Sequence, residues 1–224
     1  MTSPPRDDFF TLVHKALRAG LLTLYVEAGR LDWQDADVVT EYAQRWGRIV
    51  TLFRSHAVVE DTYIWPLLEA KRPGAVAQMG IAHEPVESDL DVVDAAMQAA
   101  VKEPTHANGL TFYRALGWFT ADMLDHLGAE EPAVMEMLWA TCTDEELGRV
   151  RGQFMSTMDP QESAWTFELI LSSSSRAEQL AVVGGMHAAM PPESFAGWLG
   201  GMSHVLPPEA NTQLMSVVDE VTGS

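Results

Sequence analysis

The chain has 224 residues, of which 47% are hydrophobic and 21% charged, a composition typical of a folded globular protein and not of low-complexity disorder. Because 32 acidic residues stand against 14 Lys and Arg, the formal net charge is −18, which disfavours nucleic acids and anionic membrane surfaces as partners. A single cysteine, Cys142, excludes an intrachain disulfide and a thiolate zinc site, and the lack of a long apolar run or signal-peptide core predicts a cytoplasmic protein without a membrane span.

The first 142 residues carry the apolar spacing of α-helices, three and four positions apart, in four segments. These segments run over residues 10–24, 49–67, 76–97 and 112–137. Helix-breaking residues separate them, and we expect Asp32 and Thr105 to cap the helices that follow. Four helices joined by short loops predict an all-α, up-down-up-down four-helix bundle over residues 1–142.

Residues 143–224 show a different pattern and predict a C-terminal extension of short helices. Thr143 and Glu146 have the spacing of a capping box. A sixteen-residue repeat links residues 183–186 to residues 199–202, and each copy leads to a Pro-Pro-Glu sequence that favours a helix start. With so few copies, we expect these helices to pack on the bundle or on a protein partner and not to form a free-standing solenoid.

Histidines occupy apolar positions in all four bundle segments, namely His14, His56, His83 and His126. Two of them begin a His-x-x-x-Glu pattern, with Glu60 and Glu130 one helical turn later on the same face. The separation from His14 to His56 is 42 residues and that from His83 to His126 is 43. The spacing therefore predicts two helix pairs related by a pseudo-twofold axis.

A single histidine in a helical core is more often a packing residue than a metal ligand. Here four imidazoles and two carboxylates would share one core, where a buried carboxylate is costly or protonated unless a cation pairs with it. The spacing fits two metal ions bridged by Glu60 and Glu130, with two histidines on each ion. Imidazole and carboxylate ligands without thiolate suit iron, manganese or zinc, and carboxylates that bridge two ions at the centre of a bundle favour iron or manganese. Ferritin-like bundles use the reversed Glu-x-x-His order and match less well.

These stretches resemble the hemerythrin family, specifically its His-His-Glu cation-binding domains. The resemblance is carried by residues 55–68 (SHAVVEDTYIWPLL) and 125–131 (DHLGAEE) and covers residues 5–142. It implies a four-helix bundle that holds an oxo- or hydroxo-bridged di-iron centre. The implied ligands are the bridging carboxylates of Glu60 and Glu130 and the terminal imidazoles of His14, His56, His83 and His126.

Glu87 marks a departure from the oxygen-carrying members of that family. These usually have a second histidine one turn after the third-helix ligand, and this chain has Glu87 there. An anionic oxygen ligand favours oxidised iron, which weakens the case for reversible oxygen carriage. Glu87 is therefore a candidate metal ligand, the alternative being an acid that does not touch the metal.

Three residues close to the predicted ligands affect the expected geometry. Pro85 and Pro132 follow His83 and Glu130 by two residues. Each helix therefore bends at the site, or the third helix begins anew near Pro85. Tyr63 either hydrogen-bonds a bridging carboxylate or packs in the core.

The sequence predicts a non-haem di-iron protein that binds O₂, NO or peroxide, and that senses or removes this ligand or buffers iron. Two alternatives stay open. A di-iron enzyme, catalase-like or an oxygenase, requires a substrate pocket beside the iron. A metal-stabilised interaction protein requires a partner surface, for which residues 143–224 are the candidate. No catalytic side chain is identified apart from the metal ligands.

Overall fold

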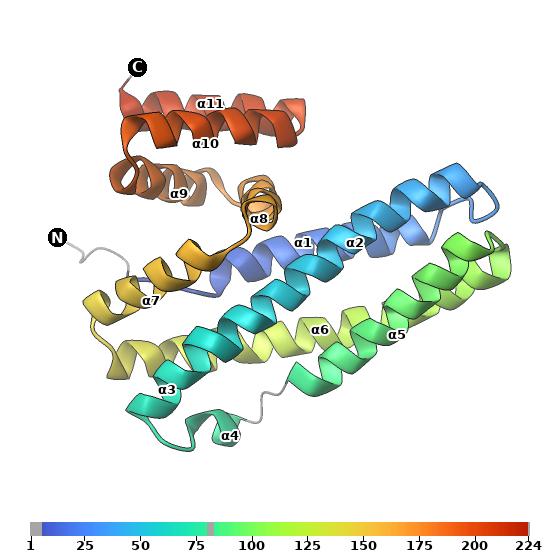
Figure 1. Ribbon diagram of the computed structural model, residues 1–224, viewed down its shortest axis with the longest axis horizontal. Helices are drawn as coiled ribbons and strands as arrows, with labels where there is room; N and C mark the ends of the chain where they lie inside the picture. Colours follow the sequence, from blue (N-terminus) through green and yellow to red (C-terminus); the bar gives the residue numbers. More distant parts are fainter. Residues whose placement is uncertain (1–5, 80–82, 224) are drawn as a thin grey trace. The chain divides into compact units, whose positions relative to one another are not determined.

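The computed structural model describes residues 6–79 and 83–223, without the side chains of Met79, His83 and Glu84. The described residues are α-helical with short loops and include no strand, which confirms the predicted all-α class (Figure 1). The chain divides into two compact units, residues 1–158 and 159–224. Within the described ranges, no helix is both long enough and apolar enough to cross a membrane.

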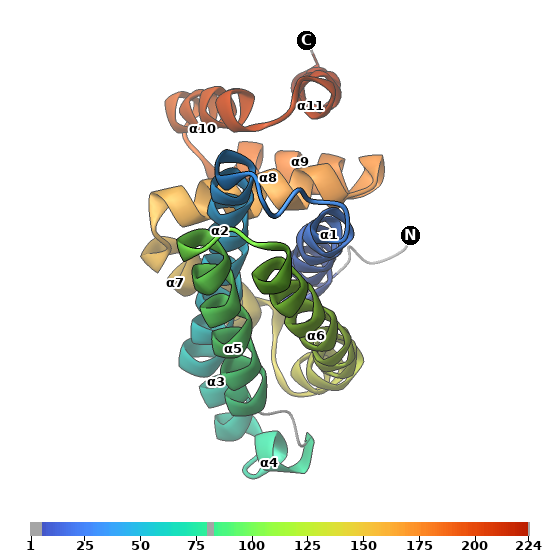
Figure 2. The same ribbon diagram turned by 90° about the vertical axis from the view of Figure 1, so that its right-hand side faces the viewer.

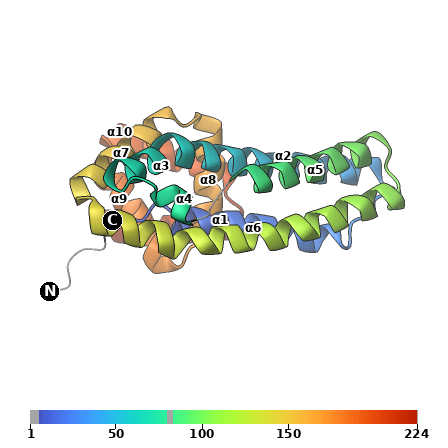
Figure 3. The same ribbon diagram turned by 90° about the horizontal axis from the view of Figure 1, so that it is seen from below.

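Four long helices form the bundle of the first unit: α1 (Thr11–Ala28), α2 (Ala36–Val59), α5 (His83–Lys102) and α6 (His106–Thr141). Each packs on two neighbours in the cyclic order α1, α2, α5, α6, so the four helices surround one core (Figure 2). Consecutive helices run in opposite directions, and Figure 3 shows α6 returning along α5 after a short connection. The up-down-up-down bundle is therefore confirmed.

Aromatic side chains fill the bundle core on the side of the α1–α2 and α5–α6 connections. The Phe112 ring contacts the rings of Trp33, Tyr42 and Trp46 at centroid distances of 5.5, 5.8 and 5.6 Å. Gly109 makes room for this cluster, because a Cβ atom there would lie 2.0 Å from Cγ of Trp33. The cluster closes the core beyond the predicted metal ligands.

The helix caps agree with the sequence at one of the two predicted positions. Thr105 caps α6, and its hydroxyl oxygen accepts the N–H of Asn108 at 3.2 Å. Asp35, and not Asp32, caps α2, and its carboxylate accepts two N–H groups of the first turn. Asp32 accepts the N–H of Gln34 inside the loop. The prediction at Asp32 is wrong because two aspartates in one short loop offer the same capping group.

The second bundle helix contains a π-helical turn that its apolar spacing does not predict. α2 continues through η1 (Glu60–Ile64) into α3 (Trp65–Lys71), and the N–H of Trp65 donates to the carbonyl of Glu60, five residues earlier. Pro66 explains this wider turn, because proline has no N–H and its ring clashes with the carbonyl four residues before it in a regular α-helix. The π turn begins at a predicted ligand, Glu60.

The wider turn shifts the buried face of the following residues by one position. Ile64 and Leu68 are buried at 2% and 0% exposure, whereas the regular periodicity places Tyr63 and Leu67 on this face. The Tyr63 hydroxyl lies 3.0 Å from the Thr157 hydroxyl. Tyr63 therefore turns away from the carboxylates and packs against Phe154 at a ring-centroid distance of 6.4 Å, so packing is the one of its two predicted roles that fits.

The third predicted segment is two helices and not one. α4 (Ala75–Met79) ends before residues 80–82, which lie outside the described residues, and α5 begins at His83. Pro85 thus lies in the first turn of α5, where a missing N–H removes no helical hydrogen bond. By contrast, α6 continues through Pro132 without a break. Of the two alternatives for Pro85, a new helix start is the correct one.

α7 (Asp144–Thr157) completes the first unit by covering one end of the bundle. Leu147 is fully buried in a cluster with Phe9 and Leu138. The Arg6 guanidinium donates to the carbonyl of Cys142 at 2.7 Å, which satisfies an acceptor at the end of α6. The compact unit therefore runs to Met158, beyond the bundle boundary at residue 142 expected from the sequence.

The second unit consists of α8 (Pro160–Ser173), α9 (Arg176–Ala189), α10 (Pro192–Val205) and α11 (Pro208–Thr222). It has an apolar core of its own, formed by Leu171, Val183, Phe195, Met202, Leu206, Leu214, Val217 and Val218. Together with α7, these helices begin every sixteen residues, at positions 144, 160, 176, 192 and 208. The sixteen-residue repeat thus extends over five helices. Only two copies are visible in the sequence, because the others share the helix start and the loop length but not the residues in between.

Candidate metal centre

Four predicted ligands from three bundle helices meet in the core. His14 of α1, His56 of α2, Glu60 of η1 and Glu130 of α6 each offer one nitrogen or oxygen atom, and these atoms all lie within 4.8 Å of one another. The side chains of His14, Glu60 and Glu130 are at most 1% exposed. The helices therefore collect a buried set of imidazole and carboxylate groups at one point.

The distances between these atoms fit the first coordination shell of a cation. His56 Nε2 lies 2.9 Å from His14 Nε2 and 3.1 Å from Glu60 Oε1. His14 Nε2 lies 3.6 Å from Glu130 Oε2 and 4.0 Å from Glu60 Oε1. Ligand atoms bound about 2.1 Å from one ion are roughly 3 Å apart when adjacent and about 4 Å apart when opposite. These separations are close to those around one metal ion, so the four side chains form a candidate site for a cation.

Glu130 faces histidines on two different helices. Its Oε2 atom points to His14 of α1, whereas its Oε1 atom lies 3.2 Å from Nε2 of His126 of α6. His126 is outside the group of four, and its side chain is 12% exposed. The Glu130 carboxylate thus has one oxygen directed toward His14 and the other directed toward His126.

The two remaining predicted ligands come from α5. His83 is the first residue of that helix, and its side chain lies outside the described residues. Glu87 is exposed, but its side chain lines the pocket beside His56 and His126. The structure therefore places Glu87 beside the four clustered side chains but not among them.

The charge state of His14 suits metal binding. Burial lowers the pKa of His14 to about 2, and the neighbouring His56 lowers it as well, while the Glu130 carboxylate acts in the opposite direction. His14 is therefore neutral near pH 7 and has a nitrogen lone pair to offer a cation. The neutral imidazole of His14 thus joins two buried carboxyl groups in a donor set that suits a cation.

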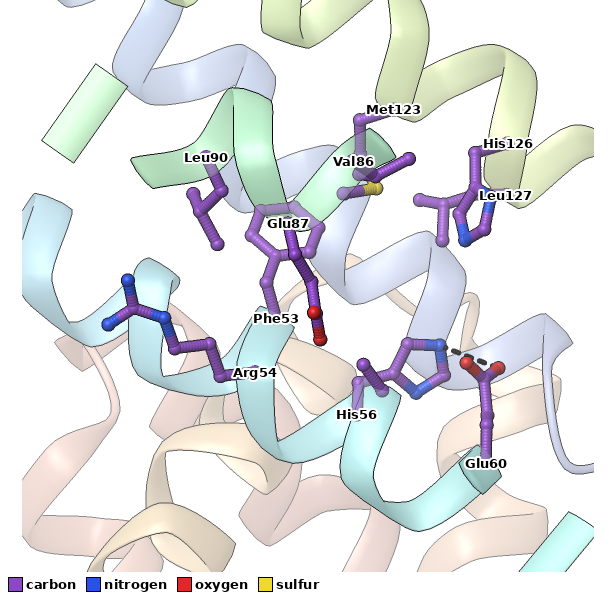
Figure 4. A pocket seen from close by; sticks show the side chains of 11 residues that line it. Phe53, Arg54, His56, Glu60, Val86, Glu87, Leu90, Met123, His126 and Leu127 are labelled. Carbon is purple, nitrogen blue, oxygen red and sulfur yellow. Dashed lines mark ion pairs between the residues drawn. The ribbon is translucent and has the colours of Figure 1, made fainter. Parts of the chain in front are cut away.

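A pocket opens directly onto this group (Figure 4). Its base includes His56, Glu60 and His126, its polar part includes Arg54 and Glu87, and its walls are the apolar side chains of Phe53, Ala57, Val86, Leu90, Met123 and Leu127. It has room for roughly two water-sized molecules. The Arg54 guanidinium donates to Asp91 at 2.7 Å. A small ligand can therefore reach the centre along an apolar wall.

Glu131 also borders the centre, although it is not part of the predicted ligand pattern. Its Oε1 atom lies 3.2 Å from Nδ1 of His14 and accepts a hydrogen bond from the Arg18 guanidinium. Adjacent residues on a helix point about 100° apart, so Glu130 faces the core while Glu131 faces α1. The only signal in the sequence is a second glutamate directly after a predicted ligand.

Comparison with known protein families gave a match over the bundle. The family described as hemerythrin HHE cation binding domain matches residues 7–138, more than half of the chain. Comparisons with curated proteins and with solved structures gave no match. The matched region contains α1, α2, α5 and nearly all of α6, and thus every predicted metal ligand.

Proposed function

The chain belongs to the hemerythrin HHE cation-binding domain family, and we propose that it binds two iron ions and, at this centre, a small ligand such as O₂, NO or peroxide. In this proposal His14 and His56 bind one ion and His126 binds the other, with His83 as its second imidazole. Glu60 and Glu130 bridge the two ions. Glu87 is the further candidate ligand from α5.

The position of the Glu130 carboxylate is the observation that carries this proposal. Its Oε2 atom lies 3.6 Å from His14 Nε2, and its Oε1 atom lies 3.2 Å from His126 Nε2. A ligand of a single ion needs only one of these contacts. A bridging carboxylate needs both, as in the carboxylate-bridged metal pairs of other helix bundles. Imidazole and carboxylate ligands without thiolate are consistent with iron.

The pocket supports the choice of a small ligand. Iron held by these residues would supply the electrons for reduction of such a ligand. The apolar side chains of Phe53, Met123 and Leu127 line the pocket beside the candidate ligands, and its small volume excludes large substrates. Glu87 lies at the same pocket and adds negative charge, which favours the oxidised ion and so a sensing or detoxifying role over reversible carriage.

The test is iron content after anaerobic loading of the metal-free full chain with ferrous iron. We expect about two ions per chain in the wild type and about one or none in Glu130→Gln. His106→Gln, at the first residue of α6, is the matched control and should retain the wild-type content. Full iron content in Glu130→Gln would contradict the bridging role, and a wild type without iron would refute the proposal.

A second measurement tests the ligand. The loaded, reduced protein is mixed with O₂, NO or hydrogen peroxide, and its visible absorption is recorded. A new charge-transfer band with one of them identifies the ligand, and sustained consumption of peroxide would favour the enzyme alternative. A protein that binds iron but shows no spectral change with any of the three would contradict the sensing role and favour a metal-stabilised interaction protein.

A further inference from the structure

We propose that Glu131, held in place by Arg18, is a positioning residue that orients the imidazole of His14 toward the metal. This inference rests on the proposed function, because it assigns a role around one of the proposed iron ligands. It adds two residues that neither the family match nor the ligand pattern identifies.

The two nitrogens of the His14 ring face different surroundings: one faces the candidate ligands and the other faces away from them. Nε2 faces His56, Glu60 and Glu130 at 2.9–4.0 Å, whereas Nδ1 faces the Glu131 carboxylate at 3.2 Å. An ionised carboxylate can only accept a hydrogen bond, so the proton of the neutral ring is on Nδ1. Nε2 then carries the lone pair, on the side where the metal ligands converge.

Arg18 holds the Glu131 carboxylate in the position where it contacts the His14 ring. Its guanidinium donates to the same Oε1 atom that lies next to Nδ1 of His14. Arg18 is one helical turn after His14 on α1, so both residues present the same face to α6. The side chains of Arg18 and Glu131 are 25% and 28% exposed, which limits competition from water for their ion pair.

The backbone of α6 supports the same orientation. His14 also hydrogen-bonds to the backbone of Leu127, one turn before Glu131. Leu127 and Glu131, one turn apart on α6, therefore both hold the His14 ring. A hydrogen bond from the outer nitrogen of a ligating histidine to a carboxylate sets its tautomer and raises its basicity, and loss of such partners typically lowers metal affinity 10–100-fold.

The alternative is that Arg18 and Glu131 only connect α1 to α6. The chain offers a matched control for this, because the Arg45 guanidinium donates to Glu27 at 2.5 Å and connects α2 to α1 with similar carboxylate exposure, 23%. Glu27→Ala thus removes an interhelical ion pair of α1 without touching His14. A purely structural role predicts the same behaviour for Glu27→Ala and Glu131→Ala.

The first experiment measures ferrous iron affinity of the full chain by anaerobic competition with a chelator. We expect Glu131→Ala to bind iron about 10–100-fold more weakly than the wild type, Glu131→Gln to be intermediate, and Glu27→Ala to stay within about twofold. In a His14→Gln background, Glu131→Ala should have no further effect, because the residue acts through His14. Equal losses in the two alanine variants, or additive losses with His14→Gln, would overturn the proposal.

A second readout needs no metal and separates this inference from the proposed function. In the nuclear magnetic resonance spectrum of the metal-free protein, the Nδ1 proton of His14 should be strongly downfield. It should shift upfield or exchange faster in Glu131→Ala and stay unchanged in Glu27→Ala. An unchanged His14 signal in Glu131→Ala overturns the positioning role even if iron binds, whereas a wild type that shows the expected proton but binds no iron refutes the proposed function alone.

Discussion

The acid stability of the metal-free protein should depend on His14. In the folded chain its pKa is lowered from 6.5 to about 2, mainly by burial and then by His56, whereas the unfolded chain has the ordinary value. Both states are neutral at this residue above pH 6.5, so its contribution to stability is fully present there. As the pH falls below 6.5, only the unfolded state takes up the proton, and stability is lost toward pH 2.

The size of this effect follows from linkage. The loss is about 1.4 kcal/mol per pH unit below 6.5, which gives about 2 kcal/mol between pH 7 and pH 5. The groups that face the ring are His56, Glu60, Glu130 and Glu131, with Arg18 behind Glu131. All of them remain in His14→Gln, so this variant removes the titration of His14 and keeps its surroundings.

The assay is urea unfolding of the chelator-treated wild type and of His14→Gln at pH 7 and pH 5. Other titrating groups contribute to both proteins, so the difference between their pH dependences isolates His14. The wild type should lose about 2 kcal/mol more than the variant over this interval. Equal losses, within about 0.5 kcal/mol, would mean that the buried ring is protonated in the folded state and would refute the reasoning.

Three further predictions concern the fold. Gly109→Ala should destabilise the protein by about 2 kcal/mol or more in thermal or urea unfolding, because its new methyl group overlaps the Trp33 indole ring. Gly47→Ala has open space around it and should stabilise α2 by up to about 1 kcal/mol. Equal effects of the two substitutions would contradict the packing at Gly109. Pro66→Ala should let the π turn revert to a regular helix, displace Glu60 and lower the iron content, and wild-type iron binding would show that the turn has another cause. A fragment of residues 1–158 should fold and bind iron like the full chain, and a fragment that aggregates would show that the second unit is required.

The bundle helices were predictable because their periodic side chains are also the buried ones. Phe10, Leu17, Leu21 and Leu24 recur at helical spacing, and all are at most 3% exposed. The π turn was not predictable from periodicity, which assumes a constant number of residues per turn. Pro66 is the local signal for it, but a proline inside a helical pattern also fits a kink or a helix end.

Connections were predicted less well than helices. Loop residues compete for the same structural role, as Asp32 and Asp35 do for the cap of α2. The third helix has the same difficulty, since Val76 keeps the apolar phase of α5 although it belongs to α4. Apolar spacing indicates which residues face the core, but it does not show whether the backbone between them is continuous.

The two adjacent glutamates of α6 show where prediction of the site from the sequence ends. The pattern from His126 selects Glu130 by its four-residue spacing, and the structure places that side chain among the imidazoles. Glu131 has the same chemistry one position later, and only the neighbours across the helix interface give it a different environment: His14 Nδ1 and Arg18 from α1. A ligand pattern within one helix identifies groups that share a face. The groups that orient those ligands come from other helices, so their sequence positions follow no fixed spacing, and they become visible only when the bundle is assembled.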